Sequence, residues 1–166
     1  MSIDKDFLEL IKQNEGILYK ISNLYADSEL DREDLRQEMI YQLWRSFKSF
    51  KGKSKFQTWM YRVALNTALV YINQKKKRIQ QSEIKEEIHG KADEIDTSNE
   101  KKIELLYKAI KKLKDLDRAI VALHLDGKNY TEIAELVGIT ETNVGTKLGR
   151  IRLKLKKLLK NTDIWN

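Results

Sequence analysis

Aromatic and cationic side chains are interleaved between residues 50 and 78, and this combination suits a single strand of nucleic acid. Each base offers a face on which a ring can stack, and each phosphate can pair with a cation. Asn66 could add a hydrogen bond to the edge of an unstacked base. Phe56 and Trp59 fit either stacking or core packing, and core packing is favoured for these two. The residues expected to contact a single strand are Phe50, Lys51, Lys53, Lys55, Arg62 and Asn66.

A second candidate motif lies between residues 130 and 144, which have the layout of a helix-turn-helix. Ala134 is small enough to let two helices approach closely, and Gly138 can adopt the positive φ that follows a helix end. The second helix of such a motif lies in the major groove of duplex DNA. The alternative is an ordinary helical hairpin with a basic surface. The side chains expected on the exposed face of the second helix are Asn143, Thr146, Lys147, Arg150 and Arg152.

Several kinds of chemistry are poorly supported by the composition. The chain contains no cysteine, which excludes disulfides, thiolate catalysis and Cys-ligated metals. Its only histidines are His89 and His124. The acidic residues lie away from the basic segment, whereas a nuclease needs clustered carboxylates in its cleft. We therefore expect no enzymatic activity, metal or cofactor. Neither an apolar run of about 20 residues nor a secretory signal is present, so a cytoplasmic protein without membrane insertion is expected.

Charge is distributed in blocks, although the formal total is only +7. Residues 45–78 contain 10 Lys and Arg and no Asp or Glu, whereas residues 1–44 and 79–100 each carry a net charge of −5. A basic solvated face is the simplest explanation of such a run. Two basic segments that flank an acidic one, however, favour two contacts with a polyanion.

The absence of proline from 166 residues favours an all-α fold, because helix interiors exclude proline. Two small helical domains are expected over residues 1–78 and 101–166, joined by a flexible acidic linker over residues 79–100. In the first domain the 3.6-residue period predicts a helix over residues 4–25, a second capped by Asp31 and a third capped by Ser54. The apolar positions predicted for the second and third helices are Leu35, Met39, Leu43, Phe47, Phe50, Phe56, Trp59, Val63, Thr67 and Val70.

The C-terminal domain should contain four helices from about residue 100 onward. The second of these should end near Gly127, Thr131 should cap the third and Thr140 the fourth. The core between the last two helices should consist of Ile133, Ile139, Val144 and Leu148. The buried face of the last helix should continue through Ile151, Leu155 and Leu158.

Three segments resemble one known family. Residues 34–39 (Asp-Leu-Arg-Gln-Glu-Met) are similar to a polymerase-docking helix, residues 50–66 to a strand-opening segment, and residues 116–158 to a promoter-reading helix-turn-helix. Nearly the whole chain is covered, and the run over residues 50–66 is the most specific part. The chain is identified as a member of the extracytoplasmic-function (ECF) sigma factors of bacterial RNA polymerase, a compact group with only an acidic linker between two domains.

The resemblance implies a sigma factor that binds core RNA polymerase through the β′ clamp helices and the β flap, as a monomer within the holoenzyme. It also implies promoter DNA as a partner, and an anti-sigma factor as a probable one. The polymerase-binding residues would be Asp34, Leu35, Gln37 and Glu38. Phe50 and Asn66 would help to hold a base flipped out of the minus-ten element, and residues 51–55 would set the preference for that base.

In the last helix, the resemblance implies that Thr146 and Arg150 contact the minus-thirty-five element, with Lys147 and Arg152 nearer the phosphates. Gly145 and Gly149 depart from the pattern, because relatives often carry long or basic side chains there. The alternative function is a helix-turn-helix regulator that acts without polymerase. Such a regulator would leave residues 34–39 and the acid-free aromatic segment without a task.

Overall fold

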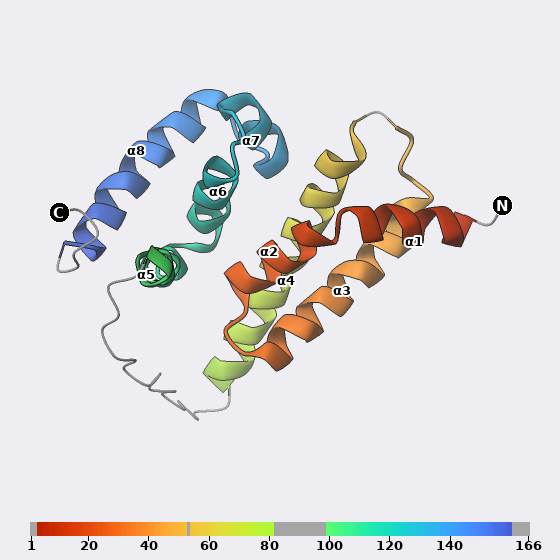
Figure 1. Cartoon of the computed structure of the whole chain (residues 1–166), viewed down its shortest axis with the longest axis horizontal. Helices are drawn as coiled ribbons and strands as arrows, with labels where there is room; N and C mark the ends of the chain where they lie inside the picture. The colour runs from red at the N-terminus through yellow and green to blue at the C-terminus, as the bar shows by residue number, and fades with distance from the viewer. Residues whose placement is uncertain (1–2, 53, 82–98, 161–166) are drawn as a thin grey trace. The chain divides into compact units, whose positions relative to one another are not determined.

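The computed structural model describes residues 3–52, 54–81 and 99–160. Within these ranges the chain forms eight α-helices and no strand, so the all-α prediction is confirmed. The helices are α1 (Ile3–Gln13), α2 (Glu15–Tyr25), α3 (Glu29–Phe47), α4 (Phe56–Gln81), α5 (Asn99–Lys111), α6 (Asp115–Leu125), α7 (Tyr130–Val137) and α8 (Glu141–Leu158). Figure 1 shows their order along the chain.

The chain divides into two compact units after Arg78, the first containing α1–α3 and most of α4, and the second containing α5–α8. The helices extend into both ends of the segment that the sequence predicts to be a linker. α4 continues through Gln81, and α5 begins at Asn99. The rest of the predicted linker, residues 82–98, lies outside the described residues.

The single helix predicted over residues 4–25 is two helices, because the chain bends at Asn14. Asn14 has φ −122° and ψ 19°, and its side-chain Nδ2 donates a hydrogen bond of 2.9 Å to the Leu10 carbonyl. Its Oδ1 accepts a hydrogen bond of 3.1 Å from Gln57 Nε2 in α4. The apolar period runs through the bend unchanged, which is why the pattern alone predicted a continuous helix.

The N-cap of α3 is Ser28, three residues before the predicted Asp31. Ser28 Oγ accepts a hydrogen bond of 3.1 Å from the Asp31 amide. Asp31 instead lies in the first turn, where a carboxylate favours the positive end of the helix dipole. The prediction was wrong because both residues are good capping types and the apolar period does not choose between them.

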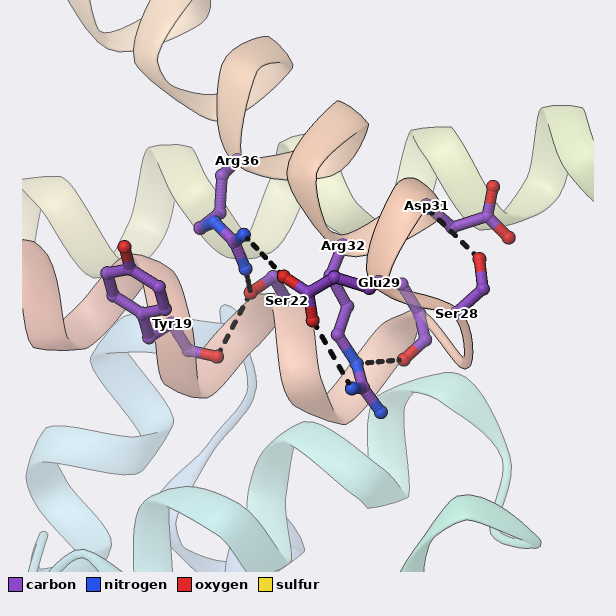
Figure 2. A network of polar contacts seen from close by, with 8 residues as sticks. Tyr19, Ser22, Ser28, Glu29, Asp31, Arg32 and Arg36 are labelled. Atoms are coloured by element: carbon purple, nitrogen blue, oxygen red, sulfur yellow. Dashed lines mark hydrogen bonds and ion pairs between the residues drawn. The ribbon is translucent and has the colours of Figure 1, made fainter.

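A polar network joins α2 to α3 (Figure 2). The Arg36 guanidinium donates to Ser22 Oγ at 3.2 Å, pairs with Glu29 at 3.3 Å, and lies 4.5 Å from the ring centroid of Tyr19. Ser22 is fully buried, and its hydroxyl donates to the Tyr19 carbonyl at 3.0 Å. A buried hydroxyl with both roles satisfied fixes the relative placement of the two helices.

The face of α4 that packs into the core differs from the prediction. Val70 is 56% exposed, and the other four predicted residues, Phe56, Trp59, Val63 and Thr67, are only half-buried. The buried positions are Met60, Tyr61, Ala64, Leu65, Ala68 and Ile72. α4 is apolar on several sides, so its period is weak and does not single out one buried face. Ser54 also does not cap this helix, because the Trp59 amide donates to the Lys55 carbonyl and thus places Lys55 at the N-cap.

In the second unit, α7 and α8 form the predicted helix-turn-helix. Gly138 ends α7 with φ +77°, and Thr140 Oγ1 caps α8 through a bond of 3.1 Å to the Asn143 amide, as predicted. The cap of α7 is Asn129, not Thr131, because Asn129 Oδ1 accepts from the Glu132 amide at 2.8 Å. The residues of the predicted core that are fully buried are Ile133, Val144 and Leu148; Ile139 is half-buried, Leu158 is exposed, and Leu159 takes its place in the core.

Two glycines of this motif should respond in opposite directions to replacement by alanine. Gly138→Ala should destabilise the second unit by about 1–2 kcal/mol, because a Cβ is strained at φ +77°. Gly149→Ala should stabilise it by about 0.5–1 kcal/mol, because Gly149 lies inside α8 with no atom within 4 Å of the added Cβ. Thermal unfolding of the two variants, followed by circular dichroism, measures both shifts. A loss of stability in Gly149→Ala would contradict the open surface at that position.

Candidate nucleic-acid interface

Five aromatic rings form a continuous cluster at one end of the first unit. Phe47 of α3 lies 5.2 Å from Phe7 and 6.1 Å from Trp59, measured between ring centroids. Phe50 lies 5.0 Å from Trp59 and 5.9 Å from Phe56. Because Phe50, Phe56 and Trp59 are half-buried, they support each other and also keep ring surface accessible. Core packing and base stacking are therefore compatible roles for these three residues.

The loop between α3 and α4 carries cations beside these rings. Lys51 and Lys55 are exposed, and Gly52 between them has φ +70°, a backbone conformation that favours glycine. Lys53 lies outside the described residues. Arg62 is exposed on α4, two turns after the loop. The described cations thus flank the aromatic cluster, as a single strand would require.

Asn66 is exposed and lines an open groove between α3 and α4, with a volume of about 920 Å³. Phe50 does not line this groove, although Trp59, which Phe50 contacts, is two turns before Asn66 on α4. The opposite wall comes from α3 and includes Gln42, Arg45 and Ser46. Sequence reasoning missed this wall. The helical spacing could have indicated it, because residues 38, 42, 45 and 46 lie on one side of the helix and form a stripe.

The other end of the same groove contains the residues that resemble a polymerase-binding motif. Asp34, Gln37 and Glu38 are exposed and line the groove, and Glu38 Oε1 accepts a hydrogen bond of 3.0 Å from Gln42 Nε2. Leu35 is the exception, because it is fully buried. A side chain with no exposed surface cannot contact a partner in this conformation, so Leu35 serves the core instead of the expected interface.

An ion pair fastens the start of α3 to the end of α4. Lys75 Nζ donates to Asp31 Oδ2, and this hydrogen bond is the largest cause that lowers the pKa of the Asp31 carboxyl below its ordinary value. Burial raises the pKa of the Tyr71 hydroxyl, and the nearby Asp31 charge raises it further. Tyr71 therefore stays neutral at physiological pH. The Asp31–Lys75 pair thus links the last turns of α4, which line the groove, to the start of α3.

In the second unit, the five predicted duplex-reading residues of α8 fall into two groups. Asn143, Thr146 and Arg150 are exposed on one face, and the Thr146 hydroxyl donates to the Thr142 carbonyl at 3.1 Å, which leaves its oxygen able to accept. The other two lean toward α6. Lys147 Nζ lies 4.0 Å from Asp117, and an Arg152 nitrogen lies 3.5 Å from His124 Nε2.

Gly145 of α8 lies beside the first residue of α7. A Cβ at Gly145 would lie 3.4 Å from the ring of Tyr130, the first residue of α7. The Tyr130 ring thus covers the flank of α8 where relatives are expected to carry a long side chain. Gly149 has no such neighbour and leaves that stretch of α8 open.

Comparisons with known proteins decide the family. Residues 10–78 match Sigma-70 region 2, and residues 103–155 match Sigma-70 region 4. The ECF RNA polymerase sigma-E factor of Haemophilus influenzae is 31% identical over 143 residues, which cover 79% of this chain and 74% of that protein. The sigma-E factor of Escherichia coli K12 is 34% identical over 133 residues, covering 73% and 68% respectively. The chain belongs to the ECF sigma factors.

Solved structures support the fold of this ECF sigma factor. It matches the sigma factor RpoE of Bartonella quintana, solved with the anti-sigma factor NepR, with a TM-score of 0.72 and 22% identity over 95% of this chain and 99% of that one. It also matches CnrH, solved with the cytosolic domain of CnrY, with a TM-score of 0.67 and 19% identity over 96% and 91% of the two chains. Residues 34–39 and the aromatic segment both lie within the region 2 match. A helix-turn-helix regulator that acts without polymerase would have no function for either segment.

ECF sigma factors are transcription initiation factors and not catalysts. Among the described residues, no cluster of three or more His, Cys, Asp or Glu could hold a metal ion. None of the described helices combines the length and hydropathy that crossing a bilayer requires.

The Asp31–Lys75 pair should give a measurable pH dependence of stability. Because the folded-state pKa of Asp31 is lowered, the pair stabilises the protein above the ordinary Asp pKa of about 3.9 and loses its effect as pH falls below it. Asp31→Asn should therefore cost about 0.2–1 kcal/mol at pH 7, as partly exposed pairs do, and less at pH 3, because the contribution declines as pH falls from the ordinary Asp pKa toward the lowered pKa of the folded state. Urea unfolding followed by tryptophan fluorescence gives both values.

Glu33→Gln is a suitable control, because Glu33 is an exposed acid of the same helix. We expect it to change the free energy of unfolding by no more than about 0.5 kcal/mol at either pH. A loss in Asp31→Asn that persists unchanged to pH 3 would show that the carboxylate charge does not account for the stabilisation.

Proposed function

We propose that this sigma factor binds core RNA polymerase, directs it to promoters, and stabilises the melted DNA from which transcription begins. The observation that carries the proposal is the groove between α3 and α4, where Asn66 and the acidic residues Asp34 and Glu38 share one surface. A base-binding side chain beside a protein-docking motif suits a subunit that must hold polymerase and DNA together. The family membership supports the same function.

The polymerase-binding surface is assigned to the end of this groove that the first half of α3 forms. Asp34, Gln37 and Glu38 offer two carboxylates and an amide on adjacent turns of α3, and the β′ clamp helices are the proposed partner. The β flap is the proposed partner of the second unit. The chain acts in this proposal as one copy per holoenzyme, in the cytoplasm and on the nucleoid, without catalysis or a cofactor of its own.

Capture of the minus-ten element is assigned to the aromatic cluster and the groove. Phe50 and Trp59 offer ring surface for stacking, which contributes roughly 1–3 kcal/mol per base. Lys51, Lys53, Lys55 and Arg62 are the proposed phosphate contacts. Asn66 reads the edge of a base that has left the duplex, and the loop over residues 51–55 sets which base is accepted.

Recognition of the minus-thirty-five element is assigned to α8. Asn143, Thr146 and Arg150 share its exposed face and are the proposed base contacts. Lys147 and Arg152 lean toward Asp117 and His124 at distances of 4.0 and 3.5 Å, which suits side chains that hold phosphates at the edges of the groove. An anti-sigma factor is a proposed regulator, as in the relative that was solved with one.

Transcription in vitro with purified core polymerase and a library of promoter fragments tests the proposal as a whole. Selected start sites that share two short boxes would support it. Failure to associate with core polymerase, combined with tight binding of duplex DNA by the chain alone, would instead support the regulator that acts without polymerase.

Two sets of variants should separate polymerase binding from strand capture. Gln37→Ala combined with Glu38→Ala should weaken assembly with core polymerase at least tenfold, because each lost hydrogen bond to a charged group contributes about 1.5–3 kcal/mol. Asn66→Ala should leave assembly near normal and reduce the amount of open complex. Gel filtration with core polymerase and permanganate footprinting measure the two effects. If Asn66→Ala abolishes assembly, the base pocket is misplaced.

Arg150→Ala should relax recognition of the upstream box. A lost contact to a base edge should cost about 1–3 kcal/mol on the preferred sequence and little on others. Binding of the holoenzyme to promoters with single substitutions in that box provides the measurement. An equal loss on every sequence would identify Arg150 as a phosphate contact.

A further inference from the structure

The α3 wall of the groove contains Arg45, for which sequence reasoning predicted no role. We propose that Arg45 binds the phosphate of the nucleotide whose base reaches Asn66. This inference rests on the proposed function of the groove and adds a residue to it. It makes the single-strand site two-sided, with a base contact on α4 and a phosphate contact on α3.

The placement of Arg45 follows from the stripe that α3 presents to the groove. Arg45 and its neighbours Gln42 and Ser46 line one wall, whereas Val63, Asn66 and Thr67 line the other. α3 and α4 are joined by a short loop, so the end of α3 lies beside the first half of α4. A groove of about 920 Å³ is at the upper end of small-molecule sites, and it can accept an extruded nucleotide.

The hydrogen-bonding capacity of this wall points to Arg45. Ser46 Oγ donates to the Gln42 carbonyl at 2.6 Å, and the Gln42 amide donates to Glu38, so both neighbours have partners. Arg45 is exposed, and within the described residues no carboxylate pairs with it. Its guanidinium offers five donors in a planar fork that matches phosphate oxygens.

The charges along the groove fix which end a phosphate can occupy. Asp34 and Glu38 lie toward the other end of α3, where Arg78 of α4 also lines the groove, so this end has two carboxylates against one cation and attracts a nucleic-acid backbone less than the Arg45 end does. Arg45 is the first cation of the acid-free run that begins after Glu38. A phosphate at Arg45 is therefore attracted locally and is kept away from the surface assigned to polymerase.

The test uses holoenzyme assembled from core polymerase and the full chain, with forked promoter DNA whose minus-ten segment is single-stranded. Arg45→Ala should weaken binding about tenfold, as loss of one charge-assisted bond does. The slope of log affinity against log salt should become shallower by about 0.7, the value for one phosphate contact on a single strand. Arg45→Lys should restore most of the slope, because it keeps the charge.

Lys48→Ala is the matched control, since Lys48 is exposed, follows α3 directly and does not line the groove. It should leave the slope unchanged. An equal effect of Lys48→Ala would show bulk electrostatics and overturn the proposal. So would wild-type slope and affinity in Arg45→Ala, or loss of core polymerase binding by that variant. If wild-type holoenzyme itself fails to bind the forked DNA, the proposed function fails as well.

Discussion

The burial of one apolar stripe on α3 determines most of what the first unit presents to its surroundings. Leu35, Met39 and Leu43 are all fully buried, which fixes the rotation of α3 about its axis. Once that rotation is fixed, helical spacing places Asp34, Glu38 and Arg45 on the groove side. The Arg36 network with Ser22 holds α2 against the same helix (Figure 2). A shift of α3 by one residue would bury the carboxylates, whose desolvation is costly, so core and surface specify the same register.

In the first unit, different side chains of α4 serve core packing and electrostatic interactions. Only small or apolar side chains of α4, such as Ala64 and Ala68, enter the core, and the cations of the acid-free segment stay near solvent. Lys75 is tied to the Asp31 carboxylate across the bundle. That pair anchors the end of α4, so the remaining charge can serve a polyanion without loosening the helix.

Sequence reasoning succeeded where a single local feature decides the conformation, and it failed where neighbouring residues compete for the N-cap, as at Ser28 and Asn129, or where tertiary contacts decide. Gly138 and the Thr140 cap follow from turn geometry that few residues can adopt, so the helix-turn-helix was predictable. The bend at Asn14 is secured by Gln57, 43 residues away, and no periodic pattern contains that contact. The partners of Lys147 and Arg152 on α6, and the buried face of α4, likewise depend on which helices meet. The α3 wall of the groove forms a stripe that helical spacing shows in the sequence. Its function could be inferred only from the structure, which places α4 opposite it.

The base pocket that we propose in this groove would tie sequence reading to strand opening. A nucleotide can reach Asn66 only after it leaves the duplex, which costs a few kcal/mol. Stacking on the exposed ring surface of Phe50 and Trp59, at roughly 1–3 kcal/mol per base, offsets that cost only while the strand stays open. In the proposed function, the free energy of recognition in the first unit would thus be gained in the melted state alone. The second unit would meet duplex DNA through the three exposed side chains of α8 that we propose as base contacts, and these contacts would hold the promoter in place while the strands separate.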